Sequence, residues 1–278
     1  MARATLSPEV VGLELAATQF AYEERDVMLY ALGIGAKELE FIFERGLKAI
    51  PTFAVIPAFP ALMGLSAAVE INPVMILHGE QGFRISKTIP TSGTLTTSGK
   101  VTGVYDKSKG ALVTIESTTK DSGGDTIFTN TSGIFIRGAG GFGGDRGPEA
   151  GNAAPDRAPD RSVEGTTLDI QAAIYRLSGD RNPLHIDPAF AKMAGYDRPI
   201  LHGLCSFGFA GRAVLAEYCG NDPARMLGMS VRFSGVVYPG DTIITDMWDE
   251  GKGKIIMQAR TQDGRVVISN AAVEVKPA

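Results

Sequence analysis

One bent segment, residues 175–188, carries a carboxylate and an imidazole that could transfer protons. Asp180 and His185 lie five residues apart. A Ser-Gly pair before Asp180 and the Asn182-Pro183 pair after it break a helix, so both side chains can point into one cavity. Imidazole titrates near neutral pH and burial tunes a carboxylate towards it, which suits acid–base chemistry. The alternative is structural: Asp180 caps the next turn and His185 is a buried, hydrogen-bonded side chain.

The elements that would hold this segment follow from hydrophobic periodicity and turn residues. The pattern around and after it predicts helices and then strands, with helices over 166–177, 188–194 and 204–218 and strands over 227–237, 241–248, 254–262 and 265–275. Earlier in the chain, β-branched runs predict strands over 74–85, 93–105, 111–119 and 125–136. Short turns between successive strands favour antiparallel pairing, so the fold class is α+β.

A stretch rich in Gly, Pro and charged residues, 138–164, separates the two sets of strands. We interpret it as a linker between an N-terminal half, 1–137, and a C-terminal half, 165–278. Tyr-x-Leu at 30–32 is echoed at 175–177, and Leu-His-Gly at 77–79 is echoed at 201–203. These echoes favour a duplicated unit, in which only the second copy has acid–base groups after its tyrosine.

Composition excludes several classes of protein. The 278 residues are 44% hydrophobic and 21% charged, with a formal charge of -4, so the chain should fold and has no basic stripe for nucleic acid. The start has no apolar signal peptide, no run approaches about 20 apolar residues, and the end is not a peroxisomal signal. Cys205 and Cys219 are too far apart on one predicted helix to pair. We therefore expect a cytoplasmic protein without a membrane span.

Two patterns could suggest a ligand that we do not expect. Residues 138–143 satisfy G-x-G-x-x-G, but more glycines follow instead of a helix, which argues against a dinucleotide site. The three histidines are scattered along the sequence and lack enough acidic or thiol companions for a zinc site. We expect neither a metal nor a cofactor.

The motif at 179–185, with 175–178 before it and 201–203 after it, resembles the signature of the R-specific enoyl-CoA hydratases, the MaoC-like or hydratase 2 family. Further motifs are similar to the hydratase 2 domain of peroxisomal multifunctional enzyme type 2, at 77–81, 140–144 and 237–242. The resemblance thus covers nearly the whole chain.

This resemblance implies a double hot-dog fold, in which each half wraps an antiparallel sheet around a long helix and the two sheets join edge to edge. It implies a non-catalytic N-terminal half with a cavity widened for long or bulky acyl chains. The implied reaction is the reversible hydration of a medium- to long-chain trans-2-enoyl-CoA to a (3R)-3-hydroxyacyl-CoA. The implied partners are the acyl-CoA substrate and a second copy in a homodimer.

By the same resemblance Asp180 and His185 are the catalytic pair, Asn182 supports their geometry and the N–H of Gly203 forms an oxyanion hole. Gly203 suits that task because it would precede a helix starting near Leu204, where free N–H groups and the helix dipole converge. Which of Asp180 and His185 acts as base stays open.

The implied substrate contacts have structural alternatives. Lys107 could bind a CoA phosphate or be a solvated turn lysine, His78 could be a core histidine, and Phe233 could simply face the core. The full set of implied contacts is His78, Gly79, Lys107, Arg181, Pro183, Leu184 and Phe233.

Three other functions compete with a general hydratase. One is a specialised MaoC-like dehydratase for branched, steroid side-chain or dicarboxylic acyl-CoAs, with the same catalytic pair. Another is a non-catalytic acyl-CoA-binding hot-dog protein, which would be expected to lack one member of the pair. The third is a hot-dog thioesterase, from which the Gly-Asp-x-Asn-Pro-x-His run points away.

Overall fold

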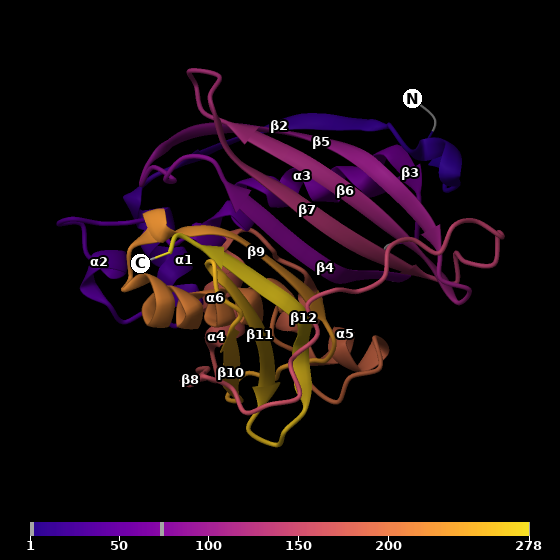
Figure 1. Ribbon diagram of the computed structural model, residues 1–278. Coiled ribbons are helices and arrows are strands. Elements are labelled where there is room, and N and C mark those ends of the chain that lie inside the picture. Colours follow the sequence, from indigo (N-terminus) through magenta and orange to yellow (C-terminus); the bar gives the residue numbers. More distant parts are fainter. Residues whose placement is uncertain (1–2, 73–74, 278) are drawn as a thin grey trace.

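One ten-stranded antiparallel sheet runs through the whole molecule. The computed structural model describes residues 3–72 and 75–277. The strands are hydrogen-bonded in the order β2-β5-β6-β7-β4-β9-β12-β11-β10-β8 (Figure 1). The first five belong to the N-terminal half and the last five to the C-terminal half, so the halves share one continuous sheet.

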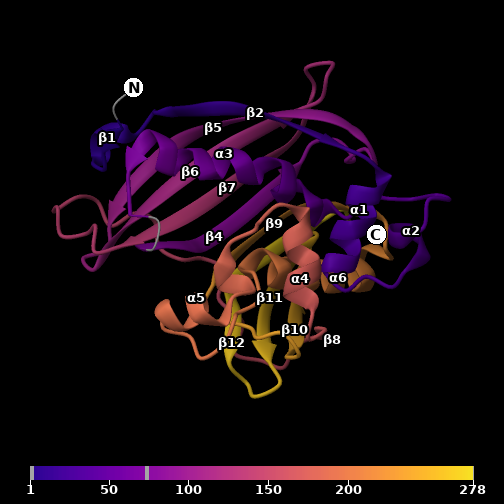
Figure 2. The same ribbon diagram turned by 180° about the vertical axis from the view of Figure 1, so that it is seen from behind.

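In the N-terminal half a long helix lies across one face of the strands (Figure 2). That helix is α3 (Val55–Ala68), preceded by α1 (Glu24–Gly33), α2 (Leu39–Ile42) and a short 3-10 turn at Pro51–Ala54. The strands are β2 (Glu14–Tyr22), β4 (Ile76–Ile85), β5 (Gly93–Asp106), β6 (Gly110–Lys120) and β7 (Thr126–Arg137). A separate parallel pair joins β1 (Ala4–Thr5) to β3 (Val69–Glu70).

The C-terminal half repeats this plan around α6 (Gly203–Cys219). Its strands are β8 (Arg161–Thr166), β9 (Met226–Phe233), β10 (Thr242–Asp249), β11 (Lys254–Thr261) and β12 (Val266–Val275). Two short helices precede α6, namely α4 (Gln171–Tyr175) and α5 (Pro188–Met193). The predicted double hot-dog fold is therefore confirmed.

The halves are joined edge to edge through β4 and β9, which pair antiparallel from Glu80 with Arg232 to Arg84 with Gly228. At the first of these pairs the Arg232 guanidinium donates to one oxygen of the Glu80 carboxylate, with Nε 3.0 Å and Nη2 2.5 Å away. Such a forked contact adds geometric specificity to the pairing. The register of the shared sheet thus places the end of β9 beside the start of β4.

The strand predictions are close to the observed strands, but three features differ. No strand was predicted before residue 74, yet β2 forms the outer edge of the sheet; residue 74 itself lies outside the described residues. The predicted linker, 138–164, ends in the first four residues of β8, which pair with β10. The helix predicted over 166–177 is shorter, because Thr166 completes β8 and α4 begins at Gln171.

The Leu-His-Gly echo does not mark equivalent places in the two halves. Residues 77–79 lie on strand β4, whereas residues 201–203 lead into helix α6. The echo of Tyr30 and Tyr175 does mark equivalent places, since each lies on the first α-helix of its half, and the rings approach to 6.1 Å between centroids.

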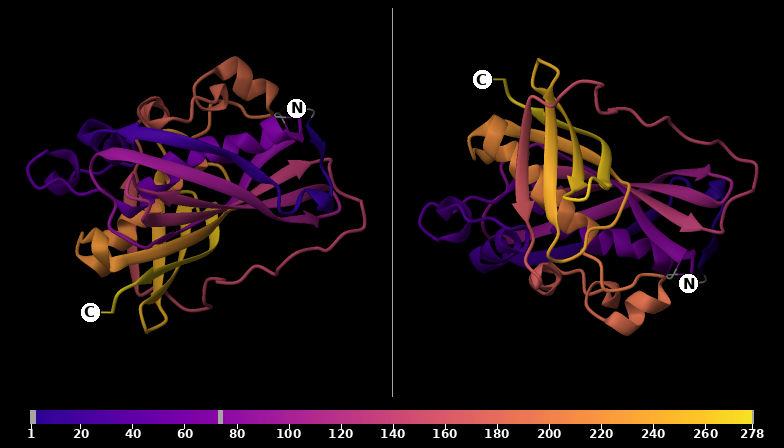
Figure 3. Two further views of the ribbon diagram at one scale, coloured as in Figure 1. Left: turned by 90° about the horizontal axis from the view of Figure 1, so that it is seen from above. Right: turned by 90° about the horizontal axis from the view of Figure 1, so that it is seen from below.

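The glycine-rich motif wraps around a carboxylate instead of a phosphate. The rest of the linker runs along the outside of the molecule towards β8 (Figure 3). At its start Asp106 accepts hydrogen bonds from the backbone N–H groups of Gly141, Ser108 and Gly143, at 2.7–2.9 Å, which hold the pKa of its carboxyl below the ordinary value. The N–H groups that a dinucleotide would need are occupied, in agreement with the sequence argument.

The helical stretch Pro51–Ala68 is long and apolar enough to be a candidate membrane span, with a mean hydropathy of 1.4. It has a second explanation in this fold, because α3 packs on β2, β5 and β6 as the core helix of the N-terminal half. Both cysteines lie on α6 and are free and buried, as their spacing predicted.

A glycine in α6 sets how closely the central helix approaches α1. A methyl group added at Gly208 would lie 2.3 Å from Cγ2 and 2.9 Å from Cβ of Ile34. We expect Gly208→Ala to lower the free energy of unfolding by up to about 2 kcal/mol, because an overpacking cost of about 1–3 kcal/mol is offset by only about 1 kcal/mol gained in helix propensity. Urea unfolding measures this difference.

Gly64 in α3 is the matched control. A methyl group there would meet only Leu15, at 3.7 Å. Gly64→Ala should therefore stabilise the protein by up to about 1 kcal/mol. Equal stabilisation by both substitutions would show that α6 and α1 adjust freely, against the close packing described here.

Candidate active site

The segment around Asp180 is kept in a non-helical turn by its own short-range hydrogen bonds. Gly179 has φ of 140°, a conformation that favours glycine, and ends the turn after α4. The Asp180 carboxylate accepts from the N–H of Asn182 at 3.1 Å, and the Asn182 side chain accepts from the N–H of Leu184 at 3.0 Å. Asn182 thus shapes the turn that carries Asp180 and His185, the predicted catalytic dyad.

His185 is buried and its tautomer is set by the backbone. Its Nδ1 lies 2.9 Å from the carbonyl oxygen of Ile200, which can only accept, so Nδ1 carries the proton. Burial lowers the pKa of His185, against smaller opposing effects of that hydrogen bond and of Asp180. The ring is therefore neutral at pH 7, with the Nε2 lone pair available to accept a proton.

The three histidines are far apart in the sequence but lie close together in the structure, so the expectation that they are scattered is wrong. The rings of His185 and His202 stack at 3.7 Å between centroids, and Asp180 is close enough to act on the pKa of His78. One ligand atom from each of Asp180, His185 and His202 lies within 4.8 Å of the others. His202 was not among the predicted site residues, and its position directly before Gly203 was the signal that could have found it.

This cluster also has to be tested as a metal site. A tetrahedral zinc site needs ligand atoms that converge on one point about 2 Å away. The His185 and His202 rings lie in planes only 29° apart and one on the other, so their nitrogens lie side by side instead of converging. The arrangement favours acid–base use of these groups over metal binding.

Gly203 is the first residue of α6, and no side chain caps this helix end. The first N–H groups of a helix have no partner within it, and they carry the positive end of the helix dipole. Gly203 is exposed, and a methyl group there would lie 3.4 Å from the ring of Phe233. Its N–H can therefore receive a developing oxyanion beside that ring.

His78 and Phe233 come together across the joint between the halves. A β-bulge at Gly79 interrupts the register of β4 and β7, and such bulges re-aim neighbouring side chains. The His78 ring meets the Phe233 ring edge to face at 5.4 Å. Burial lowers the pKa of His78 to about 4, against smaller opposing effects that include its hydrogen bond to Gln81 at 3.1 Å and nearby Asp180.

The other predicted substrate contacts are spread over two places. Arg181 and Pro183 are exposed and Leu184 is partly buried, all in the dyad turn. Lys107 lies in the turn between β5 and β6, where its ammonium donates to the carbonyl of Arg146. It is thus attached to the linker and is partly exposed.

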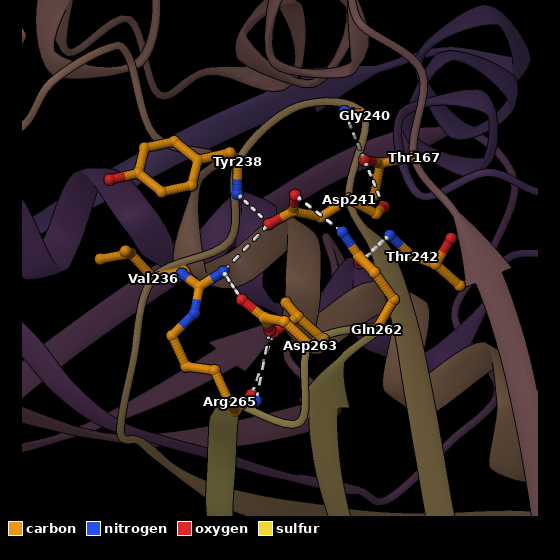
Figure 4. A network of polar contacts seen from close by, with 10 residues as sticks. Thr167, Val236, Tyr238, Gly240, Asp241, Thr242, Gln262, Asp263 and Arg265 are labelled. Atoms are coloured by element: carbon orange, nitrogen blue, oxygen red, sulfur yellow. Dashed lines mark hydrogen bonds and ion pairs between the residues drawn. The ribbon is translucent and has the colours of Figure 1, made fainter.

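A buried polar network fixes the loop between β9 and β10 (Figure 4). The Asp241 carboxylate accepts from the N–H of Tyr238 at 2.9 Å, and Arg265 donates to the carbonyl of Val236 at 2.7 Å. The next carbonyl, that of Val237, accepts from the N–H of Leu201 at 2.7 Å. The network therefore anchors the backbone directly before His202 and Gly203.

A small cavity of about 10 Å³, with room for about one water, lies against Leu204 near the start of α6, and its lining is Val55, Ala58, Phe59, Leu62, Gln81, Ser132 and Leu204. A larger surface hollow lies beside Arg161 and Tyr218, at the opposite end of α6, about 20 Å along the helix from Gly203. There Arg161 pairs with Glu217 at 2.6 Å. The smaller, mostly apolar cavity is the one that includes Leu204, the residue after Gly203.

Comparison with known proteins places this geometry in a family. Residues 20–138 match the family model described as MFE-2 hydratase 2 N-terminal domain, and residues 150–271 match that of the MaoC like domain. A Dictyostelium discoideum protein named "Probable enoyl-CoA hydratase 2" is 43% identical over 97% of this chain and 96% of its own length. The chain belongs to the MaoC-like hydratase 2 family.

Two further relatives support this membership in the hydratase 2 family. A crystal structure of a MaoC-like dehydratase from Phytophthora capsici superposes with a TM-score of 0.90 at 38% identity, covering 98% of both chains. The peroxisomal hydratase-dehydrogenase-epimerase of Neurospora crassa is 46% identical over 95% of this chain, but the chain spans only 30% of that protein. The predicted family resemblance is thus confirmed.

Proposed function

We propose that this hydro-lyase hydrates trans-2-enoyl-CoA reversibly to (3R)-3-hydroxyacyl-CoA. The observation that carries the proposal is the convergence of Asp180 and a neutral His185 within 4.8 Å, in a member of the hydratase 2 family. Hydration needs a positioned water near C3, a proton for C2 and stabilisation of charge on the thioester oxygen. Each need has a matching group at the site.

The proposed water lies between the Asp180 carboxylate and Nε2 of His185. Both are acceptors, so the water donates one O–H to each and turns a lone pair towards C3. As the C3–O bond forms, the π electrons move towards the thioester oxygen, where the Gly203 N–H donates to the enolate. One member of the dyad takes the water proton and the dyad returns it to C2; because Nε2 of neutral His185 has a free lone pair, we assign the base to His185.

The acyl chain is proposed to run past Leu204 into the cavity under α3. Its lining by Val55, Ala58, Phe59 and Leu62 is apolar, but its volume of about 10 Å³ holds about one water, so these side chains would have to move apart to admit a hydrocarbon chain. The proposed preference for medium to long chains over crotonyl-CoA rests on the two-half architecture instead of on the volume of this cavity. Branched, steroid side-chain or dicarboxylic acyl-CoAs remain the alternative substrates of the same dyad.

The test is loss of enoyl-thioester absorbance with crotonyl-CoA, trans-2-decenoyl-CoA and a branched enoyl-CoA, with assignment of the product configuration. We expect hydration to the 3R product and a higher kcat/KM for the C10 substrate than for the C4 substrate. Formation of the 3S product would contradict the proposed geometry. Failure of the folded protein to turn over any of the three would remove the general hydratase function and favour an acyl-CoA-binding role.

Assembly and compartment stay predictions. The sequence predicts a homodimer and a cytoplasmic location. Several relatives carry the word peroxisomal in their names, among them enoyl-CoA hydratase 2 of Arabidopsis thaliana, which is 37% identical over 95% of this chain. Localisation of the tagged protein in its own cell would decide between the two compartments.

A further inference from the structure

One buried side chain, His202, contacts both members of the proposed dyad. It is 1% exposed. Its ring stacks on that of His185 at 3.7 Å, and its Nε2 lies 3.1 Å from the backbone carbonyl oxygen of Asp180. The centroid of the Tyr175 ring lies 5.0 Å from that of the His202 ring. The next residue along the chain is Gly203, whose N–H is the proposed oxyanion donor.

The chemistry of these contacts assigns a proton to one ring nitrogen. A carbonyl oxygen can only accept, so Nε2 of His202 must carry hydrogen. Burial, helped by neighbouring His185, lowers the pKa of His202 to about 2, so the ring is neutral. Among the described residues its Nδ1 has no hydrogen-bond partner. His202 therefore does not exchange protons near neutral pH, and its Nε2–H is a permanent donor.

A space-filling role does not account for an imidazole at this position. A phenylalanine would stack on His185 without burying an unpaired nitrogen, which is costly in an apolar setting. What only the imidazole adds is the bond to the carbonyl of Asp180. That bond matters because Asp180 follows Gly179 in a turn that no regular helix or strand supports.

The four residues 200–203 thus hold the whole site together. The Ile200 carbonyl orients His185, His202 holds the backbone of Asp180, and Gly203 offers its N–H. This segment is itself anchored through Leu201 to the loop between β9 and β10. One rigid stretch of backbone therefore sets the distances among three catalytic groups.

We propose that His202 is a positioning residue, which fixes Asp180 relative to His185 and the Gly203 N–H. This inference rests on the proposed hydratase function. A shift of about 1 Å in a reacting group lowers a rate by about 10²-fold, whereas substrate contacts made elsewhere are unaffected. Loss of His202 should therefore act on kcat and leave KM nearly unchanged.

The test compares His202→Phe with His202→Gln, using trans-2-decenoyl-CoA. Phenylalanine keeps the stacked ring and removes the donor, whereas the glutamine amide reaches the place of Nε2 and restores the donor. We expect His202→Phe to lower kcat by about 10- to 100-fold with KM within about threefold of wild type. His202→Gln should keep a kcat at least about tenfold above that of His202→Phe.

Val113→Ala is the control for a loss of stability alone. Val113 is fully buried in the separate core of the N-terminal half, on β6. This variant should lower Tm and leave kcat at the wild-type value. A wild-type kcat in His202→Phe, or equal losses in the Phe and Gln variants, would overturn the proposal. Inactivity of the wild-type enzyme would instead overturn the hydratase function.

Nitrogen-15 NMR of the wild-type protein keeps the proposal testable if His202→Phe fails to fold. The chain has only three histidines, so their ring nitrogens can be assigned. We expect a neutral His202 protonated on Nε2 and a neutral His185 protonated on Nδ1. An Nδ1–H tautomer of His202 would exclude the hydrogen bond to Asp180 and refute the positioning role.

Discussion

Replacement of Asp180 by Asn or of His185 by Asn lowers kcat for enoyl-CoA hydration by at least about 10²-fold, the usual contribution of a positioned acid or base. Asparagine at 180 keeps the shape of the side chain and removes its charge. Asparagine at 185 can place its amide near Nδ1, keeping the bond to Ile200, while it removes Nε2. Steady-state kinetics with trans-2-decenoyl-CoA measure the effect.

Asp187→Asn is the matched control, because it makes the same chemical change seven residues from Asp180. Asp187 caps α5 by accepting from the N–H of Ala189 at 2.8 Å, and asparagine caps equally well. This variant should keep the wild-type kcat. If Asp180→Asn stays as active as Asp187→Asn, Asp180 is a structural cap, which is the alternative that the sequence left open.

The sheet was predictable because its strands are amphipathic and separated by turn residues. Alternation along 93–105 and 111–119, with a turn between them, leaves few other structures open. The outer strand β2 escaped prediction because Glu14–Tyr22 has an irregular mixture of buried and exposed side chains. Its place in the sheet depends on pairing with β5 across about 80 residues of sequence.

The proposed catalytic pair could be named from the sequence, whereas the role proposed for His202 could not. Asp180 and His185 share one short segment, so their chemistry is visible in the sequence. His202 reaches Asp180 only because the segment before α6 folds back along the dyad turn. The position of His202 directly before Gly203 indicates that it lies near the site, but linear spacing does not reveal its contact with Asp180. The same limit made three clustered histidines look scattered.

Lowering the pH from 7.5 to 5.5 should destabilise the folded protein by about 3 kcal/mol, mainly through His78 and His202. All three histidines have a lowered pKa, mainly because burial disfavours the charged ring: about 4 for His78, about 2 for His202, and a lowered value for His185. In the unfolded chain each has a pKa near about 6.5. At pH 5.5 the unfolded state therefore binds protons that the folded state does not.

This difference in proton binding determines that acid lowers the stability of the folded protein. The free energy of unfolding decreases as the pH is lowered wherever the unfolded state binds more protons than the folded state. Over this range the decrease is up to about 1.4 kcal/mol per histidine. The loss begins as the pH drops through the unfolded pKa and ends below the folded one. Carboxylates with lowered pKa, such as Asp106, weaken the fold only near and below their unfolded pKa of about 3.9, outside this window.

Urea unfolding at the two pH values measures the effect, and His78→Gln is its internal test. Because His78 and His202 have the pKa values lowered furthest below the titration window, removing His78 should reduce the difference between pH 7.5 and 5.5 by about 1.4 kcal/mol. Equal stability at both pH values would mean that the pKa of each histidine in the folded protein is close to its value in the unfolded chain. A lowered pKa keeps Nε2 of His185 unprotonated and able to act as a base down to a lower pH, so this measurement connects the packing around the dyad to its chemistry.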